Sequence, residues 1–166
     1  MTTKTEMPGP AEHYSYNLQD FRYFEDLEQG AEFNCGDFAF SEADIIDFAS
    51  KFDPQPIHTD PEAAKAGFAG ALTASGYHSY AATMCVFGQA VPKLRLIAGL
   101  KLREIDLKRP VFANAKVRVQ GRWVKLTPSK SKPDRGAVEW EADALDADGN
   151  VILTCGATVL VKRQTA

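Results

Sequence analysis

The sequence lacks two features that would place it in common classes of protein. It has no excess of positive charge, because 19 Lys and Arg against 22 Asp and Glu give a net charge of −3. Since nucleic-acid-binding proteins usually carry a basic surface, we expect no nucleic-acid partner. It has only three cysteines, Cys35, Cys85 and Cys155, without a C-x-x-C pair. This odd, widely spaced set favours reduced, buried thiols over disulfides or a zinc site, so we expect no metal.

An apolar signal segment is also missing. Residues 1–20 are polar and rich in proline, and we interpret them as a flexible tail ahead of a single domain over residues 21–166. From Ala66 to Pro92 there is no charged side chain apart from a possible charge on His78, and such a run is long enough to raise the question of a membrane span. Its glycines and hydroxyls favour a helix buried in protein instead. We therefore expect a cytoplasmic protein with no membrane partner.

The stretch DPQPIH, from Asp53 to His58, is the part of the sequence that indicates chemistry. It places a carboxylate and an imidazole five positions apart. Each proline restricts the residue before it, Asp53 or Gln55, to extended geometry, so we predict a stiff loop that is not helical. Fully extended, this segment would separate the two side chains by roughly 16 Å, so it must bend if both are to reach one small molecule.

A bent loop could hold Asp53 and His58 within hydrogen-bond distance of one water molecule. Both side chains can accept a proton, and two acceptors on one water are typical of a hydrolytic or hydrating site. The same residues can also serve only as a turn former and as a neighbour of a helix cap. Their spacing alone does not decide between these interpretations.

A helix should precede this loop. Ser41 and Asp44 form the pattern of a capping box, in which a hydroxyl and an acid satisfy open amides at a helix start. Apolar residues then recur at helical spacing, and we expect all of them on one buried face: Ile45, Phe48, Ala49 and Phe52. This helix would deliver the chain to Asp53.

Two further helices should follow the loop. The sequence Thr59-Asp-Pro-Glu62 predicts a short helix that runs to about Ala66. A long helix of small and apolar residues should then extend from about Leu72 to Val91, where Pro92 ends it. Because no face of this helix is charged, we expect other elements to wrap it.

The second half of the sequence has the two-residue period of β-strands. The alternation is found in segments 100–107, 116–120, 138–144 and, less strictly, 151–161. A slip of phase near Arg103 and Glu104 indicates a bulge, and the turn at 146–150 predicts that the last two strands form a hairpin. We expect an α+β fold in which an antiparallel sheet wraps round a long central α-helix.

Four segments of the sequence together resemble one known family. They are FEDLEQGAEF, SEADIIDFASKFDPQPIHTDPEAA, FAGALTASG and KLREIDLKRPVFANAKV. They are similar to the MaoC-like dehydratases and (R)-specific enoyl-CoA hydratases, over about Tyr23 to Lys162. The resemblance implies a hotdog fold, a homodimer or larger homo-oligomer, and an acyl-CoA thioester as the partner. It implies no separate cofactor, because coenzyme A is part of the substrate.

The resemblance also implies a reaction and its residues. The reaction is (R)-specific hydration of 2-enoyl-CoA thioesters, or the reverse dehydration of 3-hydroxyacyl-CoA. Asp53 and His58 would be the acid/base pair, and the backbone N–H of Gly76 would bind the thioester carbonyl oxygen. The residues that would contact the substrate are Gln55, Ser75 and Tyr77. Which of Asp53 and His58 performs each proton transfer stays open, because their titrations would be coupled.

Several alternatives remain at this point. A hotdog acyl-CoA thioesterase would commonly place a carboxylate on the central helix, whereas residues 71–91 contain no Asp or Glu. A non-catalytic acyl-thioester-binding protein is the other alternative. His78 can be a core histidine with its hydrogen bonds satisfied, or it can line an acyl tunnel. Arg109 can meet a phosphate of coenzyme A or simply end a strand in solvent.

Overall fold

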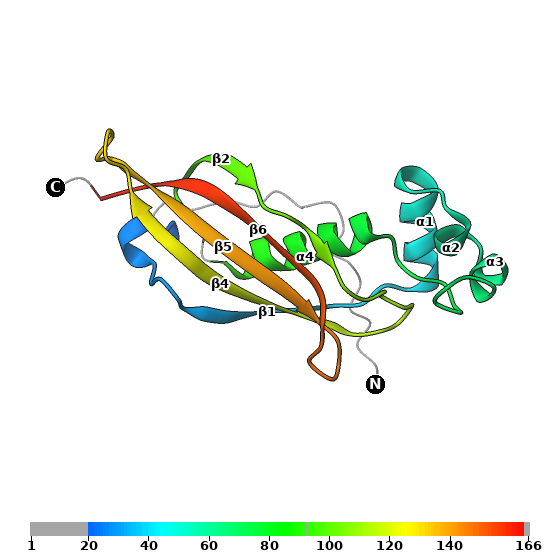
Figure 1. Ribbon diagram of the computed structural model, residues 1–166. Coiled ribbons are helices and arrows are strands. Elements are labelled where there is room, and N and C mark those ends of the chain that lie inside the picture. The colour runs from blue at the N-terminus through cyan, green and yellow to red at the C-terminus, as the bar shows by residue number, and fades with distance from the viewer. Residues whose placement is uncertain (1–19, 92, 165–166) are drawn as a thin grey trace.

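The structure, a computed structural model, describes residues 20–91 and 93–164 (Figure 1). The flexible tail predicted for residues 1–20 therefore lies outside the described residues, apart from its last position. A short 3₁₀ helix, η2 (Phe24–Asp26), is the first element, and Phe24 is buried against the glycine at position 136 of the sheet.

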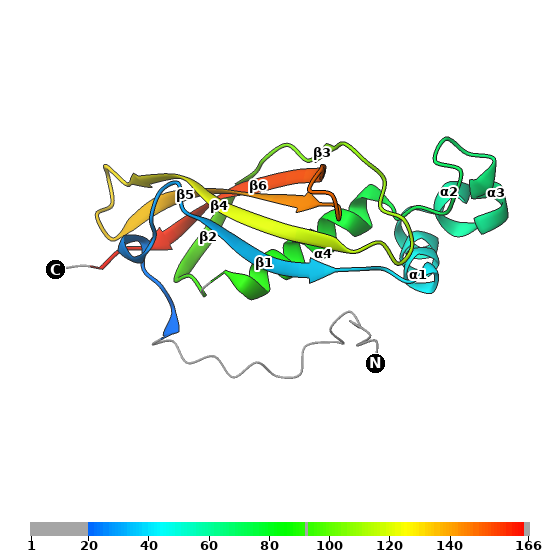
Figure 2. The same cartoon turned by 90° about the horizontal axis from the view of Figure 1, so that it is seen from below.

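The sheet contains six strands, and all of their pairings are antiparallel. The strands are β1 (Glu32–Phe38), β2 (Leu96–Leu102), β3 (Asp106–Leu107), β4 (Val117–Pro128), β5 (Arg135–Leu145) and β6 (Val151–Lys162). Their order across the sheet is β1-β4-β5-β6-β2. Strand β3 lies off this path and pairs with β6, as β2 does. The sheet curves over helix α4 (Gly76–Ala90), as Figure 2 shows. The predicted α+β arrangement, an antiparallel sheet around one long helix, is confirmed.

The core lies between the sheet and α4. On β5 the side chains that alternate towards the helix are buried, as predicted: Val138, Trp140, Ala142 and Ala144. The Trp140 ring stacks on Phe87 of α4, with ring centroids 4.1 Å apart. The turn at residues 146–150 joins β5 to β6, so the predicted hairpin is confirmed. This packing fixes α4 against the sheet and so fixes where its first residue lies.

Two parts of the sheet differ from the prediction. The sequence does not predict β1, because Asn34 and Gly36 interrupt its alternation, and the strand's register shifts between these two residues. The bulge expected near Arg103 is a full break that separates β2 from β3. Leu100 and Leu102 of β2 are 55% and 68% exposed. These two leucines therefore point away from the core of this chain.

Helix α1 (Glu42–Phe52) begins with the predicted capping box. Ser41 Oγ accepts from the Asp44 amide over 3.1 Å, and the Asp44 carboxylate accepts from the Ser41 amide over 2.8 Å. Ile45 and Ala49 are fully buried, but Phe52 is 67% exposed. The expectation that Phe52 shares the buried face is wrong, because Phe52 is the last residue of α1 and its ring, which contacts Phe48 at a centroid distance of 5.0 Å, stays largely open to solvent.

The segment between Asp53 and His58 is partly helical, which contradicts the expected non-helical loop. Gln55 is extended, as the proline after it requires, but helix α2 (Pro56–Thr59) then begins at Pro56. A proline at the first helical position costs nothing, because the amide it lacks would have had no partner there. Helix α3 (Pro61–Lys65) follows, with Asp60 as its N-cap, and confirms the predicted second short helix.

Helix α4 is shorter and less covered than predicted. It begins at Gly76 rather than near Leu72, because residues 72–75 run alongside residues 111 and 112 instead. The Ala74 amide donates to the carbonyl of Val111 over 2.8 Å. Tyr77, Ala81 and Gly88 are exposed on one side of α4. The expectation that other elements wrap the whole helix is therefore wrong for a single chain.

Candidate active site

Asp53 lies where α1 ends, and two neutral side chains hold its carboxylate. Ser75 Oγ donates to Asp53 Oδ2 over 2.6 Å, and Gln55 Nε2 donates to Asp53 Oδ1 over 2.7 Å. These donors, Ser75 first and then Gln55, lower the pKa of Asp53, and nearby His58 acts in the same direction. Together they outweigh the partial burial, which raises the pKa. Asp53 is therefore an ionised carboxylate at neutral pH.

His58 is buried on α2, and its ring has a defined tautomer. Its Nδ1 lies 2.7 Å from the backbone carbonyl oxygen of Thr73. A carbonyl oxygen only accepts, so Nδ1 carries the hydrogen, and the lone pair of the neutral ring lies on Nε2. That Nε2 faces Asp53 Oδ2 at 3.7 Å. Two proton acceptors thus face each other, too far apart for a direct hydrogen bond but close enough to share a small donor between them.

Gly76 is the first residue of α4, a helix of 15 residues. Its amide has no acceptor within the helix, and the positive end of the helix dipole lies at this position. Gly76 and His58 line the same cavity, which has a volume of about 380 Å³. Leu107 of β3 lies directly over Gly76, because a Cβ atom added to this glycine would come 2.5 Å from Leu107 Cδ1. An oxygen with developing negative charge would be stabilised beside this amide.

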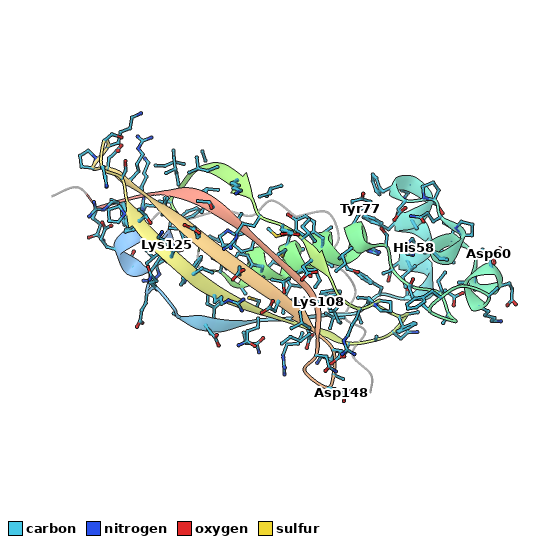
Figure 3. The ribbon with its side chains drawn as sticks, in the orientation of Figure 1. His58, Asp60, Tyr77, Lys108, Lys125 and Asp148 are labelled. Atoms are coloured by element: carbon cyan, nitrogen blue, oxygen red, sulfur yellow. The ribbon has the colours of Figure 1, made fainter. Side chains whose placement is uncertain are left out.

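Of the predicted site residues, His58 and Gly76 line this cavity, whereas Asp53 and the three residues predicted to contact substrate do not. Gln55 and Ser75 are bonded to Asp53, as described above. The Tyr77 side chain is 67% exposed, and only its amide faces the site, where it donates to Ser75 Oγ over 3.2 Å. Figure 3 shows His58 and Tyr77 at the end of the molecule where α1 and α2 meet the start of α4. Their contact with substrate stays a prediction.

No pattern in the sequence predicts the role of Thr73, which fixes the tautomer of His58. Its contribution comes from a backbone carbonyl, and no pattern of side chains predicts where a carbonyl will point.

The cavity walls also include the cationic side chains of Lys108 and Arg109, from the segment after β3. Lys108 pairs with Asp106 over 3.1 Å. The cavity thus combines apolar walls with an unpaired helix amide and two nearby positive charges.

His78 does not line the cavity and is a core histidine, as one of the two predicted alternatives has it, but its hydrogen bonds are not all satisfied. Its ring stacks on Phe40 and on Phe48, with centroid distances of 3.8 Å and 4.2 Å. Its Nδ1 is buried and has no hydrogen-bond partner among the described residues. Burial therefore lowers the pKa of His78 to about 4, although Asp44 and Asp47 act in the opposite direction. The neutral ring connects α1 to α4.

We expect His78 to make the protein less stable in mild acid. The unfolded chain binds a proton at this histidine below about pH 6.5, whereas the folded protein does so only near pH 4. Stability should therefore fall as the pH drops through this window, by up to about 2 kcal/mol between pH 7 and pH 5. Urea unfolding at both pH values should show a smaller loss for His78→Phe than for the wild-type protein. Equal losses for the two proteins would contradict this assignment.

Two kinds of feature are absent from the described part of the chain. Within residues 20–91 and 93–164, no helix is both long enough and apolar enough to span a bilayer. Over the same residues, no three His, Cys, Asp or Glu side chains gather where they could hold a metal ion.

Comparisons with known proteins agree on the type of domain. The family model for the MaoC-like domain matches residues 27–143. The crystal structure of a MaoC-like dehydratase from Rhodospirillum rubrum is 35% identical, with a TM-score of 0.79 over 87% of this chain and 99% of that one. An unliganded R-hydratase from Pseudomonas aeruginosa is 20% identical, with a TM-score of 0.70 over 86% of each chain. A search of curated proteins finds no match.

The hotdog fold is supported by a further solved structure. A Mycobacterium tuberculosis protein described as having a double hotdog fold is 15% identical to this chain, with a TM-score of 0.73. The match covers 89% of this chain and 46% of that one, so this chain corresponds to about half of the double fold. Together with the family match, this likeness confirms the predicted hotdog fold.

Proposed function

This chain belongs to the family of MaoC-like dehydratases, and on that premise we propose that it catalyses the (R)-specific hydration of 2-enoyl-CoA thioesters or the reverse dehydration of 3-hydroxyacyl-CoA. One observation carries the proposal. His58 Nε2 faces the carboxylate of Asp53 at 3.7 Å, and His58 shares its cavity with the first amide of α4, at Gly76. Two acceptors for one water and one donor for an oxyanion are the groups that this reaction needs.

In the proposed mechanism a water molecule donates one hydrogen bond to Asp53 and one to His58. As the water oxygen attacks C3 of the enoyl thioester, His58 Nε2 takes a proton from it, and Asp53 stabilises the imidazolium that forms. The electrons of the C2–C3 double bond move towards the thioester oxygen, which receives a hydrogen bond from the Gly76 amide. His58 then returns the proton to C2, so the elements of one water molecule have added to the double bond.

The cationic side chains of the cavity favour a substrate whose acyl group is attached to an anionic molecule such as coenzyme A. Lys108 and Arg109 are exposed and line the same cavity as His58 and Gly76. Arginine and lysine suit phosphate groups, with which they form charge-assisted hydrogen bonds. We therefore propose that these two side chains meet the phosphates of coenzyme A while the acyl group lies near His58.

We also propose that the chain works as a homodimer that pairs through β2. This strand is an edge of the sheet, and it presents three apolar side chains, Leu96, Leu100 and Leu102, each more than half exposed. An exposed apolar edge strand readily pairs with another strand, and a second copy related by a two-fold axis covers the same residues on both chains. The exposed side of α4 would be covered in the same assembly.

The homodimer predicts a change of mass on substitution at β2. The wild-type protein should sediment at twice the 18.2 kDa of one chain, and Leu102→Glu should shift it towards the monomer, because the buried charge would have no partner. Ala147→Glu adds the same charge in the turn between β5 and β6 and should leave the mass unchanged. Analytical ultracentrifugation checks all three proteins, and a monomeric wild-type protein would rule the homodimer out.

The direct test of the proposed reaction uses crotonyl-CoA and longer 2-enoyl-CoA thioesters. We expect loss of the enoyl thioester absorbance and formation of the (R)-3-hydroxyacyl product, identified by chiral analysis. Release of free thiol without hydration would instead indicate a thioesterase, although α4 offers no Asp or Glu for that reaction. Binding without turnover of any thioester, including branched and dicarboxylic ones, would indicate a non-catalytic binding protein.

A further inference from the structure

The carboxylate of Asp53 is held from two directions by side chains that cannot ionise. Ser75 Oγ donates to Oδ2 over 2.6 Å, and Gln55 Nε2 donates to Oδ1 over 2.7 Å. Oδ2 is also the oxygen that faces His58 Nε2. Because each oxygen has its own donor, the rotation of the carboxylate is fixed, and so is the oxygen that it presents to the imidazole.

Ser75 has no hydrogen left for a substrate. Its Oγ accepts a hydrogen bond from the Tyr77 amide over 3.2 Å. A hydroxyl has one hydrogen, so Ser75 can donate only one hydrogen bond. An ionised carboxylate only accepts, so this hydrogen is committed to Asp53. The Ser75 side chain is also fully buried. These contacts favour a role for Ser75 other than contact with the substrate.

Ser75 connects the two halves of the proposed site. As the N-cap of α4 it directly precedes Gly76, the proposed oxyanion donor. Its bond to Asp53 spans 22 positions of sequence and reaches the end of α1. One hydroxyl therefore sets the position of the carboxylate relative to the first amide of α4. Displacements of about 1 Å between reacting groups can lower a rate about 10²-fold.

We infer that Ser75 and Gln55 are positioning residues that hold the Asp53 carboxylate correctly oriented between His58 and the start of α4. The kinetic consequence rests on the proposed hydratase function, whereas the contacts with Asp53 do not. Among the described residues, the titratable group that faces Asp53 is His58 of α2. The neutral donors are Gln55, the N-cap of α2, and Ser75, the N-cap of α4.

Kinetics distinguish positioning from substrate binding. In Ser75→Ala and in Gln55→Ala, kcat should fall about 10- to 100-fold while KM stays within about twofold, because the interaction that is lost does not involve the substrate. Ser75→Thr keeps the hydroxyl and should recover most of the activity. Thr83→Val is the matched control, since it removes a buried hydroxyl of α4 that donates only to the carbonyl of Ser79, and its kcat should not change.

A second measurement does not depend on activity. The carboxyl carbon of Asp53, assigned with Asp53→Asn, is titrated by NMR in each protein. The pKa of Asp53 should rise towards its ordinary value in Ser75→Ala and in Gln55→Ala, because each loses a donor, and should not move in Thr83→Val. If Ser75→Ala fails to fold, Gln55→Ala still decides the question, because Gln55 is exposed and its loss disturbs no core packing.

Two results would overturn the inference. An unchanged titration of Asp53 would show that the two donors do not hold it, and a raised KM with unchanged kcat would assign them to substrate binding. If the wild-type protein hydrates no enoyl thioester, the proposed function fails, but the titration still decides whether Ser75 and Gln55 hold Asp53. The two failures are therefore distinguishable.

Discussion

Asp53→Asn and His58→Gln should each lower kcat for hydration by about 10²- to 10⁴-fold, the range that acid/base groups contribute. Asparagine keeps the shape of the Asp53 side chain but has no negative charge to stabilise the imidazolium of His58. Glutamine places its amide close to the position of His58 Nε2, which faces Asp53, but this amide cannot take a proton from water. Initial rates with crotonyl-CoA measure both effects.

The control for these substitutions lies on the same helix as Asp53. Asp47 is an exposed acid of α1 that pairs with Lys51, so Asp47→Asn makes the same chemical change away from the cavity and should leave kcat unchanged. Circular dichroism and thermal unfolding establish that each variant is folded. If folded Asp53→Asn kept more than about a tenth of the wild-type rate, Asp53 would not have the proposed role.

Replacing Gly76 by proline in the wild-type protein should lower kcat by about 10²- to 10³-fold, because it removes the amide that we assign to the thioester oxygen. Proline fits this position in other respects. Gly76 is the first residue of α4, where proline is favoured. Ser75 already has φ −55° and ψ 144°, the conformation that a residue before proline prefers. The substitution therefore removes one N–H and leaves the helix able to form.

Gly76→Ala is the matched control for the proline variant. Both substitutions add a Cβ atom that would meet Leu107 Cδ1 at 2.5 Å, so both require the end of the Leu107 side chain to move. Only proline loses the amide, and the ratio of kcat between the two variants isolates the contribution of the N–H. Equal activities in the proline and alanine variants would contradict an oxyanion role for Gly76.

Local signals predicted the elements that surround the site. The capping box at Ser41 and the acid and proline at positions 60 and 61 depend on neighbours within one turn, so they were visible in the sequence and are confirmed. The prediction failed for the segment from Asp53 to His58. Proline disfavours a helix in the residues before it, but whether Pro56 begins a helix depends on the residues that follow it and on the packing of that turn.

Exposure was predicted less well than secondary structure. The periodicity of α1 put Phe52 on the buried face, and the alternation of residues 100–107 put Leu100 and Leu102 on an apolar face. All three are exposed in a single chain. Periodicity tells which residues share a face, but it does not tell what covers that face or where the cover ends. The exposed face of β2 is the reason for proposing a second copy of the chain.

The sequence by itself determined the type of domain, the helix that delivers the chain to Asp53, and the pairing of Asp53 with His58 as candidate acid/base groups. Only the tertiary structure decided how these groups are held. The hydroxyl that holds Asp53 is 22 residues away in the chain, and the carbonyl that sets the tautomer of His58 is 15 residues away. Hydrogen bonds over such separations depend on how helices pack against each other, and no local pattern of residues encodes that packing.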